Sequence, residues 1–209
     1  MPIDDPRFKQ VYGAKSAQEA RAVYADWATR YDAENLAKGF LQPGMAAAAI
    51  ARFVPPDAGD ILEAGCGTGL IGLQLATLGY ERLIGLDLTP QMLALAEARG
   101  CYFRLIQHDL SHPIPLADDS VAATACFGSF GPGHAPPACL AEFVRVTRPG
   151  GLVLFNLRED VQATLGFPEI ISRLSADKLW QELFIGPLYR AFLLAEPEIV
   201  GKIRVYRVC

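Results

Sequence analysis

Three alternating glycines follow a short apolar run, and an acidic residue stands just before them. The stretch from residue 61 to residue 70 reads ILEAGCGTGL, so Gly65, Gly67 and Gly69 come directly after Glu63. Glycines permit a tight turn and let a ligand approach the backbone at the carboxyl edge of a sheet. A purely structural turn is a poor explanation, because each glycine lowers the stability of the folded chain by roughly 0.5–1 kcal/mol relative to alanine, through the conformational entropy that it loses on folding. The stretch therefore predicts a site for a nucleotide-like ligand.

Charge helps to decide which nucleotide this loop could hold. Residues 67–72 also match the G-x-G-x-x-G pattern of dinucleotide-binding proteins. No Lys or Arg lies between Arg52 and Arg82, which excludes a P-loop but not NAD, since a helix N-terminus can hold pyrophosphate without a lysine. The carboxylate of Glu63 favours a cationic ligand. S-adenosylmethionine fits, because it carries a sulfonium, an ammonium and a ribose diol but no phosphate.

Two further carboxylates follow later apolar runs. Asp87 ends the run 82–87, where a carboxylate can accept both ribose hydroxyls of either NAD or S-adenosylmethionine. Asp109 follows the run 102–107 and could accept from an adenine amino group. These positions indicate an adenosine without identifying what is attached to it.

The elements that must position these residues alternate along the chain as in β-α-β units, which predicts a mainly parallel sheet. Two helices precede it, the first capped by Ser16 with Glu19 and reaching Tyr31, the second from Met45 to Phe53. The patterns predict strands at 60–64, 82–87, 102–107, 122–127 and 151–157, helices at 69–78, 90–99, 137–147 and 168–181, and a terminal hairpin of 188–195 with 201–208. We expect residues 1–56 to form a helical cover, integrated with a main domain at 57–209.

Composition narrows the class of protein. The 209 residues are 51% hydrophobic and 20% charged, with 19 Lys and Arg against 23 Asp and Glu, which excludes disorder and makes nucleic acid an unlikely partner by charge. The sequence has neither a membrane-length apolar segment nor the layout of a secretory signal, so we expect a cytoplasmic protein with no membrane partner. The five cysteines lack zinc-ligand spacing and are interpreted as plain thiols, with no metal site.

Five motifs in order resemble the class I S-adenosylmethionine-dependent methyltransferases of the type 11/25 kind. The similarity covers about Tyr24 to Leu157, and the N-terminal helix and short C-terminal part look most like the Williams–Beuren syndrome region methyltransferase-like proteins. The motifs are Y-x-x-W-A-x-x-Y-D at 24–32, E-x-G-x-G-x-G at 63–69, G-x-D-x-T-x-x-M at 85–92, Asp109-Leu110, and R-P-G-G at 148–151. One departure is Val121-Ala122, where the family often has Phe-Asp; it concerns the register of the fourth strand and removes no cofactor contact.

The resemblance implies a fold and a set of residue roles. The fold is a three-layer Rossmann-like α/β sandwich with a seven-stranded, mostly parallel sheet of order 3-2-1-4-5-7-6, whose last strand is antiparallel, under a helical N-terminal cover. The implied cofactor residues are Gly65, Cys66, Gly67 and Gly69 at the methionine part with Glu63 ordering the loop, Asp87 at the ribose, Leu88 and Met92 flanking the adenine, Asp109 and Leu110 at its edge, and Cys126 and Phe127 facing the methyl donor.

Other residues have two interpretations each. Tyr24, Trp27 and Tyr31 share a helix face that could dock the helix, and Tyr31 could also act as a lid over the cofactor. His134, in the Gly- and Pro-rich loop 128–137, could be a general base, although a lone loop histidine more often faces solvent. The charged residues 158–160 after the fifth strand could touch substrate, but a solvated cluster is the commoner case.

The predicted activity is methyl transfer from S-adenosylmethionine to a small-molecule acceptor by direct in-line displacement, which requires alignment and no dedicated catalytic residue. Two alternatives stay open: an NAD(P)-dependent oxidoreductase, and a non-catalytic interaction module that keeps the fold. The sequence specifies neither the acceptor nor the oligomeric state.

Overall fold

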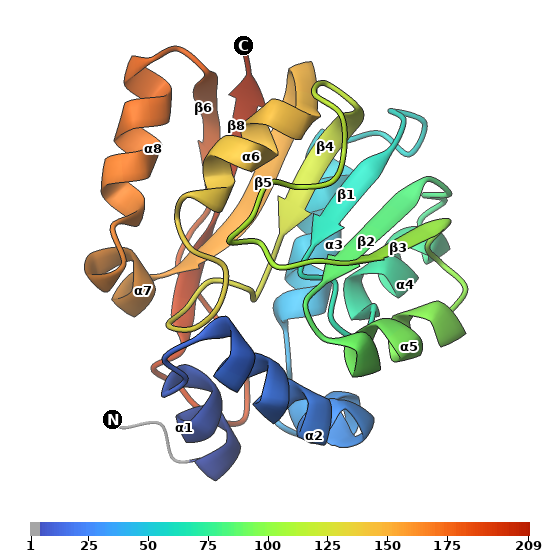
Figure 1. The fold of residues 1–209 in the computed structure, drawn as a ribbon, viewed down its shortest axis with the longest axis vertical. Coiled ribbons are helices and arrows are strands. Elements are labelled where there is room, and N and C mark those ends of the chain that lie inside the picture. Colours follow the sequence, from blue (N-terminus) through green and yellow to red (C-terminus); the bar gives the residue numbers. More distant parts are fainter. Residues whose placement is uncertain (1–4) are drawn as a thin grey trace.

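The computed structural model describes residues 5–209, which form an α/β sandwich around one eight-stranded sheet of order β3-β2-β1-β4-β5-β8-β6, with β7 paired to β8 (Figure 1). The strands are β1 (Ile61–Ala64), β2 (Leu83–Asp87), β3 (Arg104–Gln107), β4 (Val121–Cys126), β5 (Thr147–Arg158), β6 (Trp180–Ile185), β7 (Tyr189–Arg190) and β8 (Val200–Val208). The helices are α1 (Pro6–Tyr12), α2 (Ala17–Ala37), α3 (Gln42–Phe53), α4 (Leu70–Thr77), α5 (Pro90–Ala98), α6 (Cys139–Val146), α7 (Glu159–Thr164) and α8 (Phe167–Ala176).

The first five strands run parallel, so their carboxyl ends meet at one edge of the sheet. β1 pairs with β2 on one side and β4 on the other, while β8 runs antiparallel between β5 and β6. This confirms the predicted class and strand order, with the two-residue β7 as an addition. The strand order reverses between β1 and β4, because the chain continues from β1 to β2 and β3 on one side and to β4 and β5 on the other. Open α/β folds bind ligands in the crevice at the carboxyl ends of the two strands where this reversal occurs.

Alternating side chains of the strands feed two separate hydrophobic cores. Leu62, Ile84 and Val153 point to the face covered by α6 and α8, whose Phe143 and Leu174 belong to the same buried cluster. The opposite face buries Ile61, Leu83 and Leu154 against α3 and α4. Successive residues of a strand face opposite sides of the sheet. These strands are apolar on both sides because helices cover both faces of the sheet.

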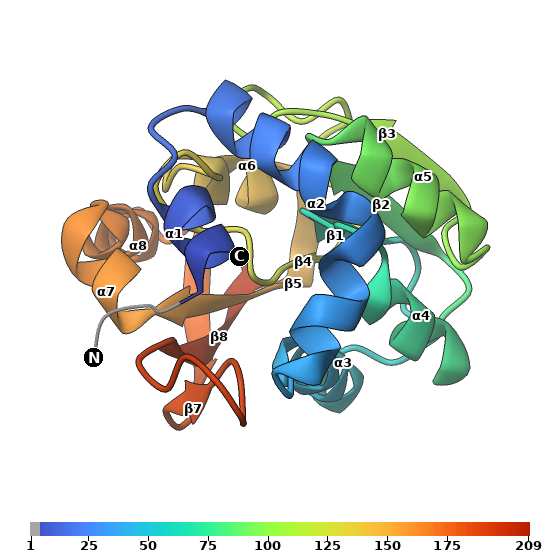
Figure 2. The same ribbon diagram turned by 90° about the horizontal axis from the view of Figure 1, so that it is seen from below.

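The first two helices lie across the carboxyl edge of the parallel strands, as the view from below shows (Figure 2). A third apolar cluster holds them there, in which Phe8 of α1 and Trp27 of α2 pack with Phe192 from the segment before β8. The Trp27 and Phe8 rings meet edge to face at 5.7 Å between centroids. Residues from the two ends of the chain therefore close the same side of the molecule.

The C-terminal part differs from the prediction in two places. The helix predicted for 168–181 ends at Ala176, because Lys178 adopts a left-handed φ of 56° and the Leu179 amide turns back to the Leu174 carbonyl at 3.0 Å. Residues 180–185 then form β6, which the sequence analysis missed. The predicted hairpin is confirmed only in part. Tyr189–Arg190 pairs antiparallel with β8, and the Ala191 amide donates to the Ile199 carbonyl at 2.9 Å. The Leu193 and Leu194 amides instead donate to the carbonyls of Gly39 and Lys38 in the N-terminal segment.

The remaining differences are short. The helices α1 and α7 were not predicted, and α2 continues to Ala37 instead of ending near Tyr31. No helix within residues 5–209 is both long enough and apolar enough to cross a membrane.

Candidate functional site

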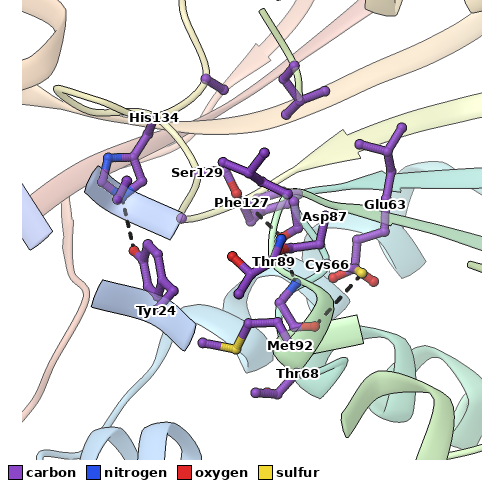
Figure 3. A pocket seen from close by; sticks show the side chains of 18 of the residues that line it. Tyr24, Glu63, Cys66, Thr68, Asp87, Thr89, Met92, Phe127, Ser129 and His134 are labelled. Carbon is purple, nitrogen blue, oxygen red and sulfur yellow. Dashed lines mark hydrogen bonds between the residues drawn. The ribbon is translucent and has the colours of Figure 1, made fainter. Parts of the chain in front are cut away.

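A cavity of about 140 Å³ lies at the carboxyl ends of β1, β2 and β4, beneath α2 (Figure 3). It gathers most of the residues that the sequence predicted for the cofactor and for catalysis. These are Tyr31, Glu63, Gly65, Cys66, Gly67, Asp87, Leu88, Met92, Asp109, Leu110, Phe127 and His134.

The glycine loop takes a shape that side chains would oppose. Gly65, Gly67 and Gly69 have φ values of 80°, 54° and 83°, in the left-handed region that favours glycine. A Cβ on Gly65 would lie 2.0 Å from the Ser129 hydroxyl, whereas one on Gly67 would meet nothing within 4 Å. The loop is thus packed closely on one side and open to the cavity at Gly67.

Asp87 holds the loop from the end of β2. Its Oδ2 accepts from the Gly67 amide at 2.9 Å, and its Oδ1 accepts from the Thr89 amide at 2.8 Å. Burial raises the pKa of this carboxyl. A carboxylate oxygen can accept more than one hydrogen bond, and Asp87 lines the cavity, so the predicted ribose role is compatible with these two bonds and stays a prediction.

Glu63 is a buried carboxyl with one oxygen unpaired. Its residue is 1% exposed, and Oε2 accepts from the Tyr102 hydroxyl at 2.7 Å while Oε1 has no hydrogen-bond partner. Burial is the main cause that raises its pKa to about 8. The Tyr102 ring packs so closely on α4 that a Cβ on Gly72 would approach it to 2.3 Å, which explains the glycine there by packing alone.

Asp32 connects the covering helix to the glycine loop. Its Oδ1 accepts from the Thr68 hydroxyl at 2.6 Å, its Oδ2 accepts from the Arg99 guanidinium, and Arg99 Nε donates to the Thr68 carbonyl at 2.5 Å. We call Asp32, Thr68 and Arg99 the α2 clasp. Asp32 ends the first motif of the sequence, but its function was not predicted, because the partners lie 36 and 67 positions away.

His134 is half-buried, whereas a lone loop histidine more often faces solvent. Its Nδ1 lies 2.7 Å from the Pro132 carbonyl and so carries the proton, which leaves Nε2 to accept from the Tyr24 hydroxyl at 3.1 Å (Figure 3). Burial lowers the pKa of His134. The imidazole is therefore neutral, and its only free lone pair faces Tyr24.

The residues predicted to contact the adenine follow β2 and β3. Leu88, Met92, Asp109 and Leu110 all line the cavity. Asp109 Oδ1 accepts from the Ser111 amide at 2.8 Å, so the carboxylate also caps its own turn.

Two predicted residues do not reach the cavity. Cys126 is fully buried in the core on the α6 side, because the adjacent Phe127 takes the cavity-facing position and neighbours along a strand face opposite ways. Gly69 caps α4 and packs against α5, where its Cβ would lie 3.2 Å from Ala96.

Several residues of the cavity were not predicted. They include Arg21, Thr68, Thr89, His108 and Ser129. Ser129 could have been found from the Gly-rich loop that contains it, whereas Arg21 gives no local signal and is brought in by the position of α2.

Comparison with known proteins agrees with this geometry. A family profile described as a methyltransferase domain matches residues 61–151. Human Methyltransferase-like protein 27 is 29% identical over 196 residues, covering 91% of this chain and 80% of that protein. Residues 61–151 match a methyltransferase domain, and together these similarities support an S-adenosylmethionine-dependent methyltransferase. These similarities favour a methyltransferase over the NAD oxidoreductase.

Two further comparisons define the limits of the similarity. The malonyl-[acyl-carrier protein] O-methyltransferase of Serratia marcescens is 40% identical over 99 residues, but the match covers 46% of this chain and 37% of that enzyme. Magnesium protoporphyrin IX methyltransferase of Synechocystis PCC 6803, crystallised with bound S-adenosylmethionine, superimposes with a TM-score of 0.60 at 14% identity, covering 97% of this methyltransferase and 90% of that chain. At that identity the likeness concerns the fold.

The residues present fit S-adenosylmethionine. Its sulfonium and ammonium are cationic, and the carboxyl groups of Glu63, Asp87 and Asp109 belong to residues that line the cavity. The open side of Gly67 is where a ligand can lie against the backbone. When bound, the cofactor supplies an activated methyl group, and the chain holds and orients it.

Proposed function

We propose that this methyltransferase transfers the methyl group to a small-molecule acceptor by in-line displacement. The observation that supports a small acceptor is a second cavity of about 60 Å³, which has Tyr24, Tyr31 and His134 in common with the cofactor cavity. Its other walls include the buried Phe8 and Trp27 of α1 and α2. An acceptor enclosed here would lie beside the methyl donor and away from bulk water, which favours alignment over any dedicated catalytic group.

The proposed contacts to the cofactor follow from position. Asp87 would accept the ribose hydroxyls, since it is a carboxylate at the end of β2 with free lone pairs. Leu88 and Met92 would contact the adenine, and Tyr31 would cover the cofactor from α2. Glu63, through Tyr102, would keep the glycine loop in place, and a cation bound beside it would favour the ionised form of this carboxyl.

His134 is the proposed proton acceptor where the substrate must lose a proton. Its neutral Nε2 is reached through the Tyr24 hydroxyl, which borders both cavities. A proton leaving the acceptor would pass to Tyr24 Oη while Tyr24 gives its own proton to Nε2. An acceptor that is already anionic would not use this route.

The test is direct. Binding of S-adenosylmethionine should first be measured by titration calorimetry, and S-adenosylhomocysteine release then followed with a set of small acceptors and with a macromolecular set of RNA and unfolded protein. Turnover with members of the small set alone supports the proposal. Turnover with RNA or protein alone would contradict it.

A further inference from the structure

The second cavity has a charge opposite to that of the cofactor cavity. Among the described residues that line it there is no Asp or Glu, and Arg158 at the end of β5 is its one Lys or Arg. The remaining walls are mostly apolar and aromatic, with Phe8, Trp27 and Phe192 fully or nearly buried. The cavity lies where α1 and α2 meet the end of β5, so its lining comes from both ends of the chain.

Arg158 is held in place with one nitrogen to spare. Its side chain is 12% exposed, Nε and Nη2 donate to the Asp160 carboxylate at 3.0 and 2.6 Å, and its guanidinium carbon lies 4.0 Å from the centre of the Tyr12 ring. The third nitrogen, Nη1, is buried and has no hydrogen-bond partner. The sequence analysis treated residues 158–160 as a solvated charge cluster, which is right for Asp160 and wrong for Arg158.

A second donor on the same cavity is also unpaired. Gln42 Oε1 accepts from the Tyr189 hydroxyl at 2.8 Å and from Asn156 Nδ2 at 3.4 Å, which fixes the orientation of the amide. Its Nε2 is buried and has no partner. Among the described residues that line the cavity, Arg158 and Gln42 are the two with a buried, unpaired side-chain polar atom, and in both that atom is a donor.

Unpaired buried donors are costly, so a ligand that brings acceptor oxygens gains from meeting them. Resting on the function proposed above, we propose that the second cavity binds the methyl acceptor through a carboxylate on an apolar, ring-sized body, with Arg158 Nη1 donating to that carboxylate. A monoanion suits the site better than a phosphate dianion, because the one guanidinium already shares its charge with Asp160. The aromatic walls would contact the body of the ligand.

Three ring-sized probes of different charge test the assignment. Benzoate, benzamide and benzylamine are titrated by NMR into the protein saturated with S-adenosylhomocysteine. We expect benzoate to bind at least about tenfold more tightly than benzamide, the range of a charged hydrogen bond, and benzylamine to bind more weakly still. Equal affinities for benzoate and benzamide, or a preference for benzylamine, would overturn the proposal, and this comparison needs only the wild-type chain.

Variants then locate the anion. Arg158→Met should remove the preference for benzoate, whereas Asp160→Asn, the matched control, should keep it because Nη1 is untouched. A preference that survives in a folded Arg158→Met protein would contradict the assignment, and thermal unfolding checks that both variants fold. Failure of S-adenosylhomocysteine to bind would count against the proposed function instead, and the probe series repeated without it still tests the second cavity.

Discussion

The cofactor cavity and the second cavity share a wall on α2, yet they are built in opposite ways. The first collects Glu63, Asp87 and Asp109 from the ends of three parallel strands, each within a few residues of the next helix or turn. The second has Arg158 and no carboxylate, and it needs α1, α2, β5 and the segment before β8 to come together. A site made by neighbouring strand ends follows from topology, whereas a site made by distant segments depends on how the cover packs.

The largest expected effect is on the pH dependence of the free energy of unfolding, through the buried carboxyl of Glu63 in the cofactor cavity. Because the folded-state pKa of Glu63 is raised to about 8, the folded chain binds more protons than the unfolded chain from the usual carboxyl range up to that pH. The free energy of unfolding of the ligand-free protein should therefore fall as pH rises from 5.5 to 7.5, by up to about 1.4 kcal/mol per pH unit from this group. Glu63→Gln should remove that part of the slope, measured by urea unfolding at several pH values.

A control separates this effect from general titration. The pKa of Glu142 is lowered, chiefly by its hydrogen bond with Arg145, so this carboxyl is ionised in both states over the same range. Glu142→Gln should leave the slope unchanged. If the Glu63→Gln and wild-type profiles were parallel, the carboxyl would not be held at a raised pKa.

The next effect separates the two cavities by ligand. Asp87→Ala removes a carboxylate that orders Gly67 and faces the proposed ribose site, and we expect S-adenosylmethionine to bind about 1.5–3 kcal/mol more weakly by calorimetry. Asp57→Ala, at an exposed acidic residue, should bind normally. Binding of benzoate should be unchanged in Asp87→Ala, and a loss of both ligands would mean that the two cavities are not independent.

A smaller effect is expected at the α2 clasp. Asp32→Ala removes the acceptor for Thr68 and Arg99, so the glycine loop loses its connection to α2. Binding of S-adenosylmethionine should weaken by about 1 kcal/mol, as expected for an ordinary hydrogen bond, and Thr68→Val should cost less because Arg99 keeps its partner. Calorimetry on the two variants gives the order, and the reverse order would show that the clasp acts through Thr68.

The smallest effect lies on the wall between the cavities. The Tyr24 hydroxyl donates to His134 Nε2 and so favours the neutral imidazole. Tyr24→Phe removes this donor, so the pKa of His134 should rise toward its ordinary value. A proton NMR titration of the ring measures it. Tyr31→Phe is the control, since its ring packs on Tyr24 without bonding to the imidazole. An unchanged value in Tyr24→Phe would mean that the hydroxyl does not donate to Nε2.

The cofactor side of the molecule was predictable because its signals are local. Glycine spacing at 65–69 and acidic residues after apolar runs are read along a few positions, and the parallel sheet brings their ends together. The limit appears at Cys126 and Phe127, where the local pattern gives the strand end but not which of two neighbours faces the cavity. Packing of α6 against the sheet makes that choice.

The rest depends on contacts between distant segments. β6 was missed because residues 180–185 continue an amphipathic pattern, and only the pairing with β8 makes them a strand. Arg158 was interpreted as part of a solvated charge cluster, because its neighbours in the sequence do not indicate that the Tyr12 ring, from the other end of the chain, packs on its guanidinium. Both errors come from tertiary packing that overrides the local pattern.

One helix, α2, forms part of the wall of both cavities. α2 contributes Tyr24 and Tyr31 to each cavity. Its Asp32 also accepts a hydrogen bond from Thr68 of the glycine loop. A displacement of α2 would therefore change the walls of both cavities at once.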